Sequence, residues 1–178
     1  MKIGKLDFSL VDESMSLVAE PVRSALSQIE SKDIFVTQID PTLSDTATFC
    51  EAYEVGADIS VNCVIVEAKR AERVWYAACL IVATDRIDVN GVVRRFLDAK
   101  KVSFAPMDTA TTLSEMEYGA ITPIGLPESW NILIDEKVAQ LPQAIIGSGK
   151  RASKLLVSGE VFAGLPNAHI FSIAKSEA

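Results

Sequence analysis

The chain has 178 residues, a formal net charge of −7 and a hydrophobic content of 49%. That length favours one domain with a substantial core, and the hydrophobic content argues against disorder. The acidic balance argues against broad nonspecific adhesion to nucleic acid, but it leaves room for a local basic patch. No apolar run approaches the roughly 18 residues that cross a membrane. The N-terminus reaches Asp7 before any hydrophobic segment develops, so we expect no signal peptide. We therefore expect a cytoplasmic protein with no membrane partner.

The cysteines and the histidine give little sign of a metal site. Cys50, Cys63 and Cys79 are odd in number and lack CxxC spacing, and two of them lie in apolar runs typical of reduced core cysteines. No nucleophile motif accompanies His169, so a structural or surface role is favoured over that of a catalytic base. We expect neither zinc nor another cofactor.

In the first half of the chain, hydrophobic periodicity predicts two helices and three strands. They are a helix over 13–30 that Pro21 kinks or divides, a strand over 34–39, a helix from Ser44 or Asp45 to about Val55 that Gly56 ends, and a hairpin with strands over 59–67 and 73–84. The polar segment 68–72 is of hairpin-loop length and is expected to join the last two strands.

The second half of the chain continues the alternation. The predicted elements are a helix over about 91–99, a strand over 101–105, a helix from Asp108 or Thr109 to near Gly119, strands over 131–135, 144–147 and 153–157, a short helix over 158–165 and a final strand over 168–173. Mixed strands and helices with several hairpins predict a mixed sheet with peripheral helices in one domain.

The most constrained segment is 119–127, with the sequence GAITPIGLP. Proline fixes φ and glycine permits conformations closed to other residues, so this loop is expected to hold one shape. A rigid loop that exposes backbone amides can hold a carbonyl or an oxyanion. A buried connection between two strands is the alternative.

A second glycine-rich segment, AIIGSGKR, occupies 144–151. It fails the P-loop pattern, because Ala144 replaces the first glycine and Arg151 replaces the Ser or Thr after the lysine. Nucleotide hydrolysis is therefore not expected. The glycines and basic residues can still bind a phosphate through backbone amides and charge. A glycine-rich turn with solvated basic residues is the alternative.

Three of these pieces occur in a family order: Tyr118–Leu126 with a GxxxP pattern from Gly119 to Pro123, then Ile134–Asp135, then Ile146–Arg151. In this order and spacing the chain resembles the YbaK/EbsC-type aminoacyl-tRNA deacylases, relatives of the editing domain inserted in bacterial prolyl-tRNA synthetases. The resemblance covers 42–173 as the family core and leaves 1–40 as an N-terminal helix and strand extension of a single domain. It implies a mixed α/β fold around a twisted, partly barrel-like mixed sheet with peripheral helices.

The resemblance also implies an activity, which is hydrolysis of the ester that joins a wrong amino acid to the 3′ end of tRNA. Mischarged aminoacyl-tRNA is then the expected partner, and an aminoacyl-tRNA synthetase is a second candidate. The family motifs place Asn62 and Gly119 at catalytic positions, and Cys63, Ala120, Ile121, Thr122, Pro123, Gly125, Asp135, Gly147, Gly149, Lys150, Arg151 and Lys154 at substrate-binding positions.

Two positions depart from the family pattern. Asn62 stands where relatives usually carry a catalytic or substrate-orienting lysine, and it supplies hydrogen bonds but no cation. Lys154 stands where many relatives carry an acid that helps to hold the amino acid, and a base there favours a phosphate or restores the missing charge from another direction. Two hypotheses follow: an active deacylase of a divergent branch, and a YbaK-like module that binds aminoacyl-tRNA or a small ligand without hydrolysis.

Overall fold

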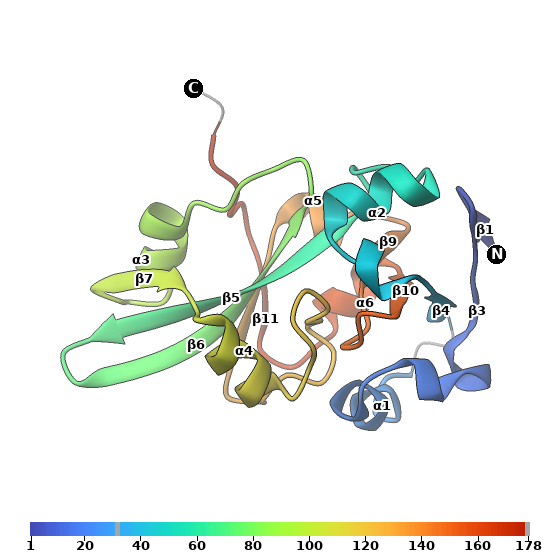
Figure 1. The fold of residues 1–178 in the computed structure, drawn as a ribbon. Coiled ribbons are helices and arrows are strands. Elements are labelled where there is room, and N and C mark those ends of the chain that lie inside the picture. Colours follow the sequence, from blue (N-terminus) through green and yellow to red (C-terminus); the bar gives the residue numbers. More distant parts are fainter. Residues whose placement is uncertain (31–32, 177–178) are drawn as a thin grey trace.

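The structure is a computed structural model that describes residues 1–30 and 33–176. Its strands form two main sheets and a small N-terminal hairpin (Figure 1). The hairpin is β1 (Lys2–Ile3) with β2 (Leu6–Asp7); the antiparallel sheet has the order β3 (Ser9–Leu10), β4 (Phe35–Gln38), β10 (Ser153–Val157), β9 (Ala144–Gly147); the mixed sheet has the order β11 (Ala168–Ile170), β8 (Asn131–Ile134), β6 (Arg73–Val82), β5 (Val61–Arg70), β7 (Lys101–Phe104).

The two main sheets meet at the start of β5. Ser60 forms a parallel bridge with Ile145, and the amide of Ile145 donates to the carbonyl of Ile59 at 2.8 Å. Buried side chains of both sheets, such as Val36 and Leu80, belong to one hydrophobic core. Across the described residues the sheets adjoin without closing into a barrel. The combination of these sheets with helices confirms the predicted mixed α/β fold.

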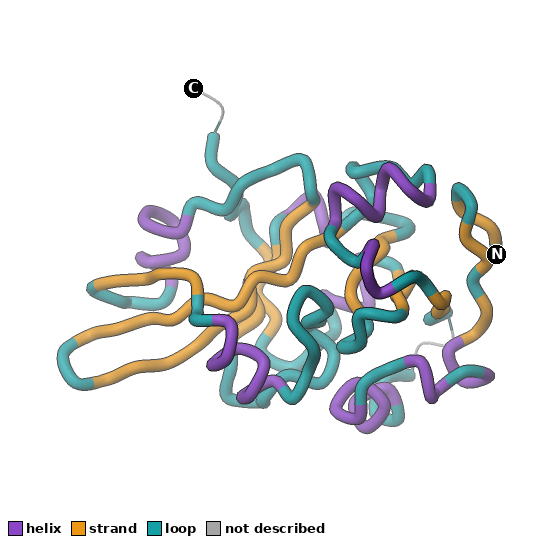
Figure 2. The backbone as a smooth tube through the Cα atoms, viewed as in Figure 1, coloured by secondary structure: helices purple, strands orange, loops and turns teal. Residues whose placement is uncertain are grey.

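Six α-helices among the described residues lie around the sheets (Figure 2). They are α1 (Glu20–Leu26), α2 (Thr46–Tyr53), α3 (Arg94–Phe96), which follows a π-helical turn at Val89–Val93, α4 (Met107–Ser114), α5 (Glu136–Ala139) and α6 (Gly159–Ala163). Short 3₁₀ turns occupy Val11–Glu13, Met15–Leu17 and Pro41–Leu43. None of these helices is long and apolar enough to cross a membrane.

Local backbone chemistry explains where the elements depart from the predicted boundaries. The predicted helix 13–30 is divided at the extended residues Val18 and Ala19, and Pro21 occupies the first turn of α1, a position where its missing N–H costs nothing. Helix α4 ends at Ser114 because Glu115 adopts the left-handed conformation with φ of 56°. Strands β5 and β6 run through most of the predicted connection and turn tightly at Ala71, whose φ is 52°.

Candidate active site

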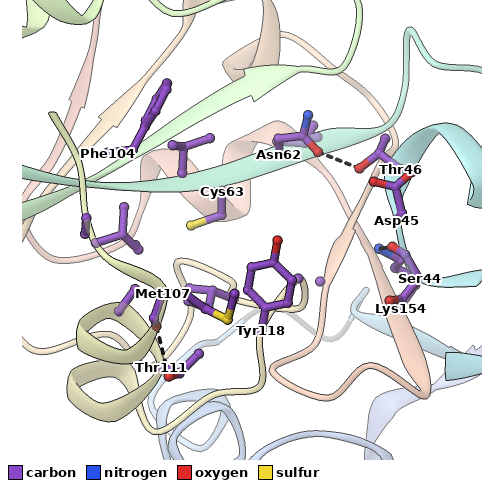
Figure 3. A pocket seen from close by; sticks show the side chains of 18 residues that line it. Ser44, Asp45, Thr46, Asn62, Cys63, Phe104, Met107, Thr111, Tyr118 and Lys154 are labelled. Atoms are coloured by element: carbon purple, nitrogen blue, oxygen red, sulfur yellow. Dashed lines mark hydrogen bonds between the residues drawn. The ribbon is translucent and has the colours of Figure 1, made fainter. Parts of the chain in front are cut away.

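A cavity of about 470 Å³ lies between strand β5, the start of helix α2, helix α4 and the loop that follows α4 (Figure 3). Segments that are distant in sequence meet here, because β5 joins the two sheets and β9 and β10 approach it from the other side. The lining comes from residues 44–46 and 61–65, from Phe104, Ala105, Met107, Ala110 and Thr111, and from Tyr118, Gly119, Ile121, Gly147 and Lys154.

Strand alternation separates the two β5 residues that the family motif singles out. Cys63 packs against the main core together with Val61 and Ile65, and its sulfur is directed into the cavity (Figure 3). Asn62 points to the other side, where its amide oxygen accepts a 2.7 Å hydrogen bond from the Thr46 hydroxyl. Burial, with a smaller effect of neighbouring Cys79, raises the pKa of Cys63, so its thiol stays protonated at neutral pH.

Lys154 places a buried ammonium group in the cavity. Only 7% of the residue is exposed. Its Nζ donates to the Ser44 carbonyl at 3.2 Å and lies 5.0 Å from the centre of the Phe49 ring. Burial lowers the pKa of Lys154, whereas the nearby Cys50 and Asp45 partly oppose that effect. An ammonium has three donors and this one makes a single hydrogen bond within the described residues, so donors remain for a ligand.

Ser44 and Asp45 add polar groups at the start of α2. The Ser44 hydroxyl is buried and has no hydrogen-bond partner among the described residues. An orphaned buried hydroxyl is costly unless a ligand or water meets it. One carboxylate oxygen of Asp45 accepts from the amide and hydroxyl of Thr48 and caps α2. Both residues line the cavity, so the polar end of this space presents a hydroxyl, an ammonium and a carboxylate together.

The GxxxP loop, defined here as Gly119–Pro123, is held by a close backbone contact with the end of β9. A Cβ atom on Gly147 would lie 2.5 Å from the Ala120 carbonyl oxygen, so only glycine fits. The same oxygen accepts from the Gly149 amide at 2.7 Å. Within the described chain, the amides of Gly119 and Ile121 donate to no group. The loop is thus rigid and retains free N–H donors at the cavity.

Arg151 and Lys150 fasten the surroundings of this loop. The guanidinium of Arg151 donates to the carbonyls of Tyr118 at 3.1 Å and Pro41 at 3.2 Å. Lys150 donates through Nζ to the Ser16 carbonyl at 2.8 Å. Both side chains therefore already make intramolecular contacts, and neither lines the cavity.

Six of the predicted site residues line the cavity: Asn62, Cys63, Gly119, Ile121, Gly147 and Lys154. Ala120, Gly149, Lys150 and Arg151 support it from behind. Pro123 and Gly125 lie instead in a second groove between α1, α6 and the loop, and the buried Thr122 lines neither space.

Asp135 is held away from the cavity by backbone contacts. Its carboxylate accepts from the amides of Lys137, Ile173 and Ala174 at 3.0–3.2 Å. It therefore caps α5 and fastens the C-terminal segment to the mixed sheet. The structure describes no group of three or more residues arranged to hold a metal ion.

Several lining residues were not predicted from the sequence. Ser44 and Asp45 were recognised only as helix caps, while Thr46 and Met107 carried no motif. Tyr118 belongs to the quoted family segment but was not assigned a role. A polar cluster directly before a helix that faces a motif strand is the signal that would have found the first three.

Residues 40–165 match the family model of the aminoacyl-tRNA editing domain. No curated protein sequence matches the chain. Among solved structures, a candidate trans-editing enzyme for prolyl-tRNA synthetase is 14% identical, with a TM-score of 0.74 over 88% of this chain and 96% of that chain. The hypothetical protein APE2540 is 16% identical, with a TM-score of 0.76 over 88% and 100%.

A structure reported for epitope backbone grafting onto scaffold proteins is 14% identical, with a TM-score of 0.75 over 89% of this chain and 97% of that chain. At these identities the structural likeness shows the fold alone. The family model, in contrast, spans more than half of the chain and includes both the GxxxP loop and Lys154. The chain therefore belongs to the aminoacyl-tRNA editing domain family.

Proposed function

We propose that this protein is a trans-editing hydrolase that cleaves the ester of a mischarged aminoacyl-tRNA in the cytoplasm. The observation that carries the proposal is the buried ammonium of Lys154, next to the unpartnered Ser44 hydroxyl, in the cavity of an editing-family fold. A buried cation with unused donors is costly to keep without a ligand that accepts from it. The carbonyl oxygen of an ester is such an acceptor, and it gains negative charge during hydrolysis.

The reaction requires an activated carbonyl and a water molecule. Water attacks the carbonyl carbon and the bond from that carbon to the ribose oxygen breaks. One proton of the water passes to the leaving ribose oxygen, and the other is released to solvent as the amino acid becomes a carboxylate. The ammonium of Lys154 and the free amides of Gly119 and Ile121 can stabilise the oxyanion from two sides. A ribose hydroxyl of the substrate is the candidate group for positioning the water, because Asn62 is tied to Thr46.

The remaining lining suits an amino acid. The carboxylate of Asp45 can accept from the α-ammonium group, and the wall around Cys63, Ile65 and Ala110 is apolar. A pocket of this kind distinguishes side chains by size, at about 1–3 kcal/mol for one methylene. An aminoacyl-tRNA synthetase is the candidate source of the mischarged substrate.

The contact between Asn62 and Thr46 favours a second candidate function. A family lysine replaced by an amide that is already hydrogen-bonded removes one cation from the site. A module with that change can bind aminoacyl-tRNA or a small ligand without hydrolysing it. The two candidates differ in whether Lys154 acts on the ester carbonyl or only binds the substrate.

A panel of mischarged tRNAs separates the two functions, with release of the amino acid as the measurement. Turnover above the spontaneous rate on at least one substrate supports the hydrolase. Retained tRNA binding with no turnover on any substrate establishes the binding module instead. Asn62→Ala is the companion variant, and unchanged turnover in it removes that side chain from the mechanism.

A further inference from the structure

The cavity mouth carries an aromatic ring that has no packing partner of its own. Tyr118 lines the cavity, yet 56% of the residue is exposed. Its hydroxyl and its ring make no hydrogen bond or ring contact with the residues that the structure describes. In Figure 3 the ring projects into the space that the labelled cavity residues surround. An aromatic face presented in this way is a surface for a flat ligand.

The backbone beneath this ring is fixed. Gly119 takes a positive φ of 76°, and the guanidinium of Arg151 donates to the Tyr118 carbonyl at 3.1 Å and to the Pro41 carbonyl at 3.2 Å. The Arg151 amide also donates to the Glu117 carboxylate at 2.9 Å. The backbone that carries the ring is therefore held in place before any ligand arrives, and a positively charged group lies at its carbonyl.

An exposed ring, with a guanidinium bound to the carbonyl of the same residue, matches the chemistry of a nucleotide. An unpaired base stacks on an aromatic face, and its phosphate pairs with arginine. The guanidinium of Arg151 also lies next to the cavity lining, because a Cβ atom added to Gly119 would be 3.2 Å from its Nη1 atom. The aromatic surface and Lys154 thus line one cavity, and the guanidinium lies at its edge.

We propose that Tyr118 is the stacking surface for the 3′-terminal nucleobase of the aminoacyl substrate, with Arg151 beside its phosphate. This inference rests on the proposed function, because the ester is joined to the ribose that carries this base. Stacking on Tyr118 then sets how far the ester carbonyl reaches towards Lys154. Since every base has a π face, this contact can position the end of any tRNA. Discrimination between amino acids is then left to the cavity that holds the amino-acid side chain.

Adenosine 5′-monophosphate is the probe, because tRNA ends in adenosine and the nucleotide cannot be hydrolysed as an ester of an amino acid. Its affinity is measured by calorimetry or by NMR titration for the wild type, Tyr118→Ala and Tyr118→Phe. We expect Tyr118→Ala to weaken binding about 5- to 150-fold, the range that base stacking covers, and Tyr118→Phe to stay close to the wild type. Adenosine without the phosphate should bind more weakly than the monophosphate.

Phe96→Ala is the matched control, because it removes another partly exposed ring, one that packs on His169 and Phe171 outside the cavity. Equal affinity of Tyr118→Ala and the wild type for the nucleotide overturns the inference, and so does a wild type that does not bind it. Nucleotide binding that depends on Tyr118, in a protein that releases no amino acid, supports the nucleotide site and overturns the hydrolase. The two proposals therefore fail separately.

Discussion

At the scale of single residues, Lys154 is a lysine held in a buried position. A lysine this buried loses hydration, and within the described part of the chain it recovers one hydrogen bond and the face of Phe49. Structural need does not account for it, because an apolar side chain of similar length would fill the same space on β10 at lower cost. Its presence is best explained by a ligand that accepts from its unused donors.

Lys154→Met tests this explanation. Methionine keeps most of the volume and removes the charge, so we expect stability equal to or above that of the wild type. Deacylation should fall about 100- to 1,000-fold if the ammonium stabilises the oxyanion. Thermal unfolding and the rate of amino-acid release are the two measurements. Loss of activity together with loss of the fold would contradict this separation of roles.

The same residue gives a pH dependence of known sign. Burial lowers the pKa of Lys154 below the ordinary lysine value of 10.5, so the unfolded chain binds more protons than the folded one between the lowered pKa and 10.5. Through that alkaline window the wild type should gain stability relative to Lys154→Met, while its enzyme-dependent deacylation falls as the ammonium is lost. Urea unfolding of both proteins across this range is the measurement. A stability difference independent of pH would show that Lys154 does not titrate with the fold.

Asp135 shows why a family motif does not fix a role. Its carboxylate accepts from three backbone amides, and two of them belong to the C-terminal segment. We expect Asp135→Ala to cost about 2–5 kcal/mol of unfolding free energy, because it leaves these donors without an acceptor. The KM of the folded variant should not change.

Chemical denaturation and steady-state kinetics at a permissive temperature measure the two quantities separately. Asp40→Ala is the control, since Asp40 caps an exposed turn in the same manner and should cost less. A raised KM for Asp135→Ala with normal stability would restore the substrate-binding role that the sequence predicted.

The sequence predicted part of the site. A motif shows which residues belong together, but it does not show which contacts their side chains make. The sequence motif located Gly119, Ile121, Gly147 and Lys154, which line the cavity. It did not show that Asn62 turns to Thr46, since that contact joins β5 to the start of α2. Tyr118 was missed because its exposure depends on how Arg151 holds its backbone.

At the scale of elements, periodicity located the long hairpin, β4 and α2, where the apolar pattern and the cap signals agree. It failed for β1–β3 and α5, which are two to four residues long and too short to show a period. Left-handed residues such as Glu54 and Glu115 ended helices before the expected glycines. Such ends depend on whether a residue adopts a left-handed backbone conformation, which a pattern of apolar residues does not show.

Helix α1 and the loop 119–127 are joined through a glycine contact. Gly125 has φ of 94°, and a Cβ atom on it would collide with the Pro21 carbonyl. Gly125→Ala should therefore cost about 2 kcal/mol or more, through backbone strain and a shift of α1. The shift passes to the GxxxP loop, so deacylation should fall as well.

Gly164→Ala is the matched control for that substitution. The nearest atoms to an added Cβ are 3.6 Å away, and the backbone there has a negative φ of −84°. We expect no loss, or a gain of about 0.4–1 kcal/mol from the lower entropy of the unfolded chain. Thermal melts of the two alanine variants measure the contrast, and equal melting temperatures would rule out the contact as a constraint on α1.

At the scale of the whole molecule, the N-terminal 40 residues are part of the fold rather than an appendage. Strand β4 lies between β3 and β10 in the antiparallel sheet. Ala19 packs closely on Gly149, where an added Cβ atom would lie 2.4 Å from the Ala19 Cβ. The Ala19 amide donates to the Ser148 carbonyl at 3.1 Å. A segment without family motifs thus supports the glycine-rich turn next to the cavity from behind, which only the three-dimensional arrangement reveals.

The net charge of −7 limits how this protein could hold the tRNA that we propose as its substrate. An acidic surface repels the acceptor stem, so affinity must come from the end of the nucleic acid, where Arg151 and the cavity lie. We expect a shallow dependence of binding on salt, with a slope of log K against log[salt] of about −1 to −3, as for one to three phosphate contacts. Arg151→Gln should make that slope shallower by nearly one, as expected for the loss of one phosphate contact. Filter binding of aminoacyl-tRNA across a salt series measures both slopes, and a slope as steep as that of a basic nucleic-acid-binding protein would place the main contact along the stem instead.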